Sequence, residues 1–258
     1  MKISTILLFS LLLASCVTVP GTDRSQLILI STSEEHSLGA REFNKLKTTV
    51  PISQDSEIRK LISRVGNNIS KVAPLPGAQW EFVAFNEPET PNAFCLPGGK
   101  VGIYTGILPV THNEAGLAAV MGHEVAHAVA RHGAERLSQA MLLQFGGVLI
   151  SQVIGEDDPA TRETVLAAYG IGSTIGVVLP HSRSNELEAD KLGMLYMAKA
   201  GYDPNEAIEF WKRFKNFKGN RNKTPAFLST HPLDDTRIAQ LQKMLPEATR
   251  LYLQTIKQ

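Results

Sequence analysis

The segment MGHEVAHAVARHG, residues 121–133, constrains this chain more than any other stretch. It places His123 and His127 four residues apart, with Glu124 directly after the first histidine. On a helix, residues i and i+4 share one face, so both imidazoles can reach one metal ion. Glu124 lies one step round the helix, where it can reach a metal-bound water whose pKa zinc lowers to about 7. The pattern predicts a zinc-binding catalytic helix; histidines satisfied by hydrogen bonds in the core are the alternative.

The third protein ligand distinguishes the classes of zinc peptidase, because a catalytic zinc usually keeps its fourth position open. A metzincin would place a histidine ten residues after His123, but that position holds Gly133. Further along, NELEAD offers Glu186 on the same helix face as Asp190, with Glu188 turned about 200° away. We therefore expect a gluzincin arrangement, in which Glu186 binds zinc and Asp190 orients a histidine N–H. Alone, these carboxylates would indicate only an exposed acidic helix start.

The remaining patterns favour a mostly helical α+β fold with a small sheet. Helical spacing predicts helices from near Ser33, over Asp55–Val72, Asn113–Gly133, Arg183–Lys199 and Asp203–Phe214, and from near Leu233. Strand patterns cover Trp80–Phe85, Ala93–Leu96 and Lys100–Tyr104, the last two forming a hairpin around a Pro-Gly-Gly turn.

Several segments together resemble the HtpX, Oma and CAAX-prenyl-protease superfamily of zinc peptidases. The resemblance rests on EEHSLGARE, PNAFCLPGGKVGIYTGIL, HEVAHAVARH, SRSNELEAD and STHPLDDTRI, which follow the family's order across most of residues 34–240. The closest likeness is to the exported bacterial branch that LoiP and BepA typify. It implies a zinc endopeptidase with one Zn²⁺ per chain and a gluzincin-type domain, residues 34–258, with its sheet beside the HExxH helix. The chain shows no tetratricopeptide array after this domain, so the LoiP-like layout fits better.

The resemblance also assigns roles. The zinc ligands would be His123, His127 and Glu186. Glu124 would be the general base that later protonates the leaving amine. Asp190 would not bind zinc itself but would orient a histidine ligand through its ring N–H. His231 lies where exported members carry a histidine that can approach the zinc, either to cap it at rest or to stabilise the oxyanion of the reaction. Arg237 would share this electrostatic work. A loop histidine and a helix salt bridge are the ordinary alternatives for the last two residues.

The resemblance makes the first strand of the predicted hairpin an edge strand beside the zinc. An extended polypeptide could add to that edge by backbone pairing, which selects shape more than sequence. The candidate substrate-binding residues are Asn92, Ala93, Phe94 and Cys95. Unfolded or misassembled polypeptides are the expected substrates, and a paired interior strand is the structural alternative.

The N-terminus predicts export and lipidation. Residues 1–15 have a basic start and a short apolar run, as in a signal peptide, and LASC resembles a lipobox that ends at Cys16. Lipidated Cys16 would anchor the protein in the periplasm to a membrane. By resemblance to bacterial lipoproteins, Val17 in place of an aspartate after the cysteine favours the outer membrane over the inner one. An ordinary signal peptide with an incidental cysteine is the alternative. Residues 16–33 would be a tether, and Cys95, left without a disulfide partner, a small buried hydrophobe.

Two uncharged runs around EDDPATRE predict a helical hairpin at residues 138–179. It would act as a lid over the cleft or as a membrane contact. The formal net charge of +1 gives no reason to expect nucleic acid as a partner. The sequence thus predicts an envelope endopeptidase that removes misfolded or damaged proteins. A chaperone or assembly factor for outer-membrane proteins with a latent protease site is the rival, and a structural lipoprotein with an inert metal site a weaker one.

Overall fold

The computed structural model of the protein describes residues 16–145, 182–217 and 225–257. The predicted signal peptide and most of the predicted 138–179 hairpin lie outside these residues. The described residues form helices and two small sheets, which confirms the mostly helical α+β class. Among them, no helix combines the length and apolar character needed to cross a bilayer.

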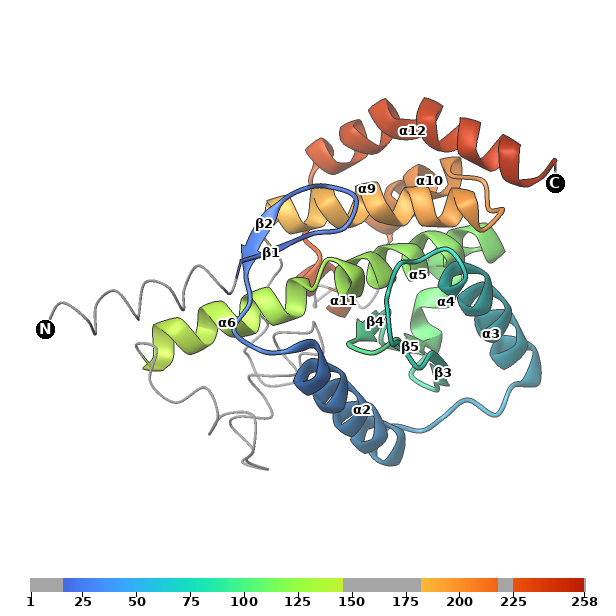
Figure 1. Ribbon diagram of the computed structural model, residues 1–258. Coiled ribbons are helices and arrows are strands. Elements are labelled where there is room, and N and C mark those ends of the chain that lie inside the picture. The colour runs from blue at the N-terminus through green and yellow to red at the C-terminus, as the bar shows by residue number, and fades with distance from the viewer. Residues whose placement is uncertain (1–15, 146–181, 218–224, 258) are drawn as a thin grey trace, which may run out of the picture.

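Long helices lie in layers beside the larger sheet (Figure 1). α5 (Glu114–Val129) lies between this sheet and α9 (Arg183–Lys199), while α12 (Asp235–Thr255) covers the far side of α9. α10 (Asn205–Asn216) packs against both α5 and α12. Because α5 has partners on opposite sides, it is apolar all round rather than along one stripe, and almost all of it is buried. The HExxH motif therefore lies in the centre of the fold.

The larger sheet has three strands in the order β3–β5–β4. β3 (Glu81–Phe85) runs parallel to β5 (Lys100–Tyr104), and β4 (Ala93–Leu96) runs antiparallel to it. Gly98 and Gly99 turn the β4–β5 hairpin with φ angles of 77° and 80°, which disfavour any residue with a Cβ. β4 is thus an edge strand of this sheet, as expected, and it faces α5.

Helices α2 (Thr32–Thr49) and α3 (Ser56–Ser70) begin at side-chain caps. Ser31 accepts a hydrogen bond from the Glu34 N–H, and the Glu34 carboxylate accepts one from the Ser31 N–H, which forms a capping box. Asp55 caps α3 in the predicted position. α3 packs on β3 and α5, whereas α2 packs on β4 and β5. The short helices α4 (Leu108–Thr111) and α11 (Ala226–Thr230) lie in the connections.

Much of the segment 16–33, expected to be a tether, is folded onto the domain. β1 (Cys16–Thr18) and β2 (Ser25–Leu27) pair as an antiparallel hairpin, and the side chains of Val19 and Ile30 are buried. Composition suggested a linker because the segment is rich in Ser and Thr, but its scattered apolar residues find a place in the core. A connection from this hairpin to a membrane stays a prediction.

The helix that carries HExxH ends earlier than predicted. α5 ends at Val129, and α6 (His132–Phe145) begins three residues later, so Gly133 lies inside α6 rather than capping α5. Arg131 separates the helices with a φ of +56°, a conformation that is unusual for a residue with a Cβ. Its guanidinium is held by the Glu35 carboxylate at 2.7 Å, a contact that no local sequence pattern reveals.

Candidate metal centre

Two helices cross at glycines and bring the predicted ligands together. His123 and His127 project from α5, and Glu186 projects from the first turn of α9. At the crossing, a Cβ built on Gly193 would lie 2.7 Å from the His123 backbone nitrogen, so the two backbones touch directly. This close approach brings the Glu186 carboxylate within reach of both imidazoles.

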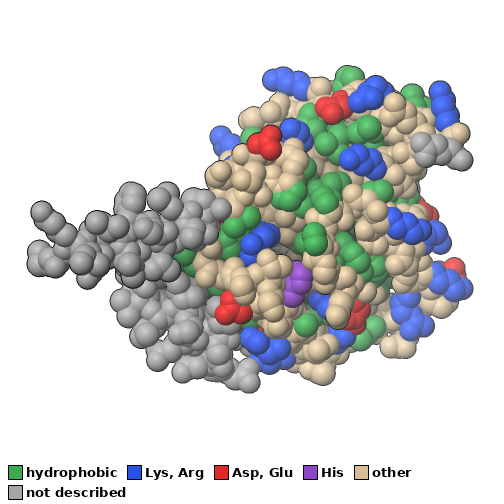
Figure 2. Space-filling view, in the orientation of Figure 1, with side chains coloured by type: hydrophobic (Ala, Val, Ile, Leu, Met, Phe, Trp, Pro, Cys, Tyr) green, Lys and Arg blue, Asp and Glu red, His purple; other side chains and the backbone are tan. Residues whose placement is uncertain are grey.

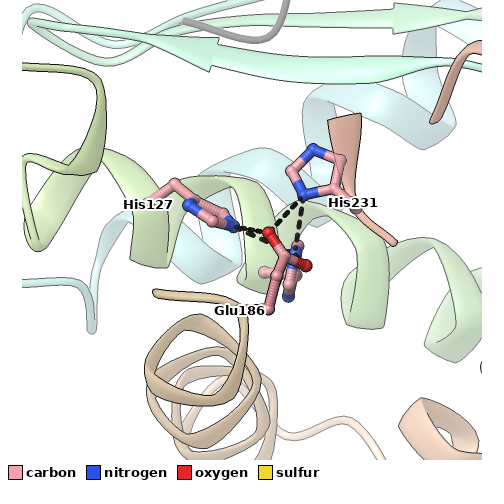
Figure 3. A group of neighbouring side chains, drawn as sticks. His127, Glu186 and His231 are labelled. Carbon is pink, nitrogen blue, oxygen red and sulfur yellow. Dashed lines mark hydrogen bonds and ion pairs between the residues drawn. The ribbon is translucent and has the colours of Figure 1, made fainter. Parts of the chain in front are cut away.

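Four buried side chains converge on one point (Figure 3). His123 Nε2 lies 3.1 Å from His127 Nε2 and 3.2 Å from His231 Nδ1. Glu186 Oε1 lies 3.3 Å from His127 Nε2 and 3.0 Å from His231 Nδ1. His231 directly follows α11, so three separate segments of the chain supply the cluster.

The chemistry and spacing of these atoms fit zinc. Imidazole nitrogen and carboxylate oxygen are zinc ligands, and tetrahedral bonds of 2.0–2.1 Å would separate neighbouring ligand atoms by about 3.4 Å. The separations of 3.0–3.3 Å in the cluster are close to that value. An acidic residue with three histidines, all at most 6% exposed, has no comparable reason to gather in an apolar core.

Glu124 lies beside the cluster without joining it. Its Oε1 lies 3.3 Å from His231 Nε2, so His231 bridges the ligand cluster and the predicted base. The carboxylate is 4% exposed, and burial raises its pKa, although nearby imidazoles oppose the shift. A narrow pocket lined by Glu124, His127 and Cys95 has about 10 Å³ of free volume, about enough for one water molecule.

Asp190 and Arg237 support the ligands from behind. Asp190 Oδ1 lies 3.0 Å from His123 Nδ1, as predicted for a carboxylate that orients a metal-binding histidine. Arg237 donates to both oxygens of Asp190 at 2.7 and 2.8 Å and lies 2.6 Å from Glu186 Oε2. Burial alone would raise the pKa of Asp190, but the charge of Arg237 holds it below its usual value. The structure thus places Arg237 on the carboxylates, with its guanidinium stacked 4.0 Å over Trp211.

Aromatic side chains close the other side of the cluster. The Phe227 ring lies 4.6 Å from that of His231, and Trp211 lies 5.7 Å from His123, centroid to centroid. Cys95 is buried near Glu124, and burial raises the pKa of its thiol. This agrees with the prediction that Cys95 is a small buried hydrophobe.

The cluster and the residues in contact with it contain seven of the sequence-predicted site residues: His123, His127, Glu186, Glu124, His231, Asp190 and Arg237. Asn92 directly precedes the edge strand β4, and Ala93 and Cys95 pack in the core around α5. The Phe94 ring instead packs on Phe43 and Phe85 in a separate core cluster, because successive side chains of a strand point to opposite faces, so its position does not support the predicted role in substrate binding.

The sequence reasoning missed the aromatic wall, and it also missed the buried contact between His132 and His127. The one sequence signal for this contact was the presence of His132 five residues after His127. On the face shown in Figure 2, basic side chains are interspersed with hydrophobic and acidic ones rather than gathered in a stripe.

Comparison with known proteins matches most of the chain to one family. A model described as peptidase family M48 matches residues 55–245. The mitochondrial metalloendopeptidase OMA1 of Saccharomyces cerevisiae is 33% identical over 253 residues, covering 92% of this chain and 71% of that protein. OMA1 of Schizosaccharomyces pombe is 40% identical over 187 residues, covering 72% of this chain and 53% of that protein. The beta-barrel assembly-enhancing protease of Escherichia coli is 25% identical over 244 residues, covering 93% of this chain and 50% of that protein. The chain therefore spans only about half of the last two relatives.

Proposed function

Because the chain belongs to peptidase family M48, a family of zinc-dependent metalloproteases, we propose that it is an endopeptidase acting on unfolded polypeptides of the cell envelope. The observation that carries the proposal is the convergence of His123, His127 and Glu186 next to the buried Glu124 carboxylate. These three ligands would hold one zinc ion. When bound, zinc supplies Lewis-acid chemistry, which acidifies a water and polarises the scissile carbonyl.

Glu124 is the proton carrier of the proposed reaction. Its raised pKa suits a group that takes a proton from the attacking water and later gives it to the leaving amine. Arg237 and Asp190 act at a distance from the substrate: the first neutralises the buried carboxylates, and the second fixes the His123 ring through Nδ1.

His231 closes the site in this conformation. Its Nδ1 lies among the three proposed ligands and would take the fourth ligand position, which a catalytic zinc keeps for water or substrate, and its Nε2 contacts Glu124. We propose that this arrangement is a resting state and that residues 226–231 must move before a substrate binds. The Phe227 N–H also donates to Pro91 O, so the same segment is bonded just ahead of the edge strand.

The substrate would lie along β4. This edge strand is buried against α5, and the Asn92 side-chain oxygen beside it is buried without a hydrogen-bond partner in the described part of the chain. A buried acceptor without a partner is uncommon, and a substrate N–H would satisfy it. Backbone pairing along Ala93–Leu96 would then favour extended chains over folded ones.

Location at the envelope rests on the N-terminal sequence. We propose that residues 1–15 direct export and that lipidated Cys16 anchors the protein at the outer membrane, where misfolded or damaged envelope proteins are its substrates. Two relatives are named as proteases of mitochondria and one as a beta-barrel assembly-enhancing protease, so the compartment needs its own test. Labelling with radioactive palmitate in the parent chain but not in Cys16→Ser would support the anchor; equal labelling would contradict it.

The closed site favours a second candidate, a chaperone or assembly factor with a latent protease. Removal of zinc with a chelator should abolish cleavage of an unfolded protein, and added zinc should restore it. Cleavage that survives zinc removal would overturn the peptidase proposal. If the protein instead suppresses aggregation of an unfolded outer-membrane protein equally well with and without zinc, the chaperone is the better account.

A further inference from the structure

A chain of hydrogen-bond contacts leads from His127 away from the metal centre. His127 Nδ1 lies 2.9 Å from His132 Nδ1, and His132 Nε2 lies 2.9 Å from Glu188 Oε2. His132 is fully buried and Glu188 is 8% exposed. Neither residue belongs to the predicted ligand set, yet His132 contacts the ligand His127 and Glu188 contacts His132.

The atom of His127 that faces the metal centre determines the direction of each hydrogen bond in this series. His127 turns Nε2 toward the cluster, so that nitrogen needs its lone pair for zinc and the ring proton resides on Nδ1. His127 then donates to His132 Nδ1, which accepts. His132 must carry its own proton on Nε2 and donates it to the Glu188 carboxylate. Each donor meets an acceptor while both imidazoles stay neutral, which is the state that zinc binding requires.

The N-terminal hairpin holds the outer end of the chain. The Thr22 hydroxyl donates to Glu188 Oε1, and Arg24 Nε donates to Glu188 Oε2 at 2.9 Å. Arg24 also binds Glu135 of α6 at 2.9 Å. The loop between β1 and β2 therefore reaches the support of a zinc ligand more than a hundred residues away in sequence.

We propose that His132 and Glu188 are positioning residues that fix the ring and tautomer of His127, and that Arg24 completes this relay from the N-terminal hairpin. The inference rests on the zinc site of the proposed function. The relay does for His127 what the direct contact of the Asp190 carboxylate does for His123. Loss of such an outer partner typically lowers metal affinity about 10–100-fold.

Zinc affinity of the full chain, measured by competition with a chromophoric chelator, tests the relay without any peptidase assay. Glu188→Ala should weaken zinc binding about 10–100-fold and shift the visible spectrum of the Co²⁺-substituted protein. The matched control is Glu42→Ala, because Glu42 is also a buried glutamate but lies on α2 and pairs with Lys45, apart from the relay; its zinc affinity should equal that of the parent. Arg24→Ala should give a severalfold loss.

A double-mutant cycle separates the relay from a general effect on folding. His132→Asn places an amide oxygen where Nδ1 stood, which keeps the acceptor for His127 but removes the link to Glu188. In this background, Glu188→Ala should cause no further loss of zinc affinity. If Glu188→Ala does not fold, as judged by circular dichroism, His132→Ala against His132→Asn gives the same test, since only the alanine removes the acceptor.

The outcomes that overturn the relay differ from those that overturn the zinc site. Equal zinc affinity in the parent, Glu188→Ala and His132→Ala would overturn the relay alone. An undiminished effect of Glu188→Ala in the His132→Asn background would also overturn it, because Glu188 would then act by another route. Failure of the parent to bind zinc would overturn the metal centre, and the relay with it.

Discussion

Gly122 of α5 and Gly193 of α9 lie backbone against backbone at the helix crossing that assembles the metal centre. A Cβ on Gly122 would lie 2.8 Å from Gly193 O, and one on Gly193 would lie 2.7 Å from the His123 nitrogen. No side chain fits there without separating the helices. The distance from Glu186 to the two histidines is therefore set by residues that carry no catalytic group.

Gly193→Ala should loosen this crossing. An added methyl in a tight backbone contact costs about 1–3 kcal/mol of stability, and the separated helices would also weaken zinc binding. Denaturant unfolding and zinc competition measure the two effects. Lys191→Ala on the exposed face of the same helix is the control. Unchanged zinc affinity in Gly193→Ala would show that the crossing does not set the ligand geometry.

His231→Ala should open the fourth ligand position and free Glu124 from its imidazole contact. Cleavage of an unfolded protein should therefore become faster than in the parent, while zinc binds somewhat more weakly because one ligand atom is lost. Steady-state cleavage rates at saturating zinc provide the measurement, with His36→Ala on α2 as the control. A large fall in rate would instead assign His231 to oxyanion stabilisation.

Arg237→Ala should destabilise the metal-free protein by about 3–5 kcal/mol, because it leaves Glu186 and Asp190 buried without their cation. Denaturant unfolding in the presence of a chelator measures this loss. Arg250→Ala, at an exposed position of the same helix, should change stability little. A loss below about 1 kcal/mol for Arg237→Ala would mean that the ion pairs contribute little to the fold.

Glu114 should make the free energy of unfolding depend on pH in the acid range. Hydrogen bonds from the Arg64 guanidinium lower the pKa of Glu114 from its ordinary 4.5, although burial opposes the shift. A carboxyl whose pKa is lowered by folding stabilises the protein above its unfolded pKa, and this stabilisation is lost as pH falls through the folded pKa. The free energy of unfolding of the parent should thus fall more steeply below about pH 4.5 than that of Glu114→Gln. Parallel curves would contradict this assignment.

The convergence of the three predicted zinc ligands could be expected from the sequence because their spacing is local. HExxH fixes the first two by helix periodicity, and the face shared by Glu186 and Asp190 selects the third carboxylate over Glu188. The predicted helix starts at Asp55 and Asn113 agree with the structure for the same reason, since each of these side chains accepts hydrogen bonds from backbone groups within three residues.

Features that depend on distant partners were not predictable. The break at Arg131 depends on Glu35, which lies 96 positions earlier in the chain. On an uninterrupted helix, His132 would lie about 140° round from His127, so periodicity placed it away from the metal centre. The folded hairpin at residues 16–27 likewise depends on contacts with α6 and α9 that no pattern within the segment encodes.

If Glu124 is the base of a zinc peptidase site, its removal must slow cleavage of an unfolded protein by the zinc-loaded chain. The parent should cleave such a substrate internally, and Glu124→Gln should be about 10²–10⁴-fold less active with zinc still bound. Glu114→Gln, which changes the other glutamate of α5, should cleave like the parent. Equal cleavage by the parent and Glu124→Gln would show that Glu124 is not the base of the reaction.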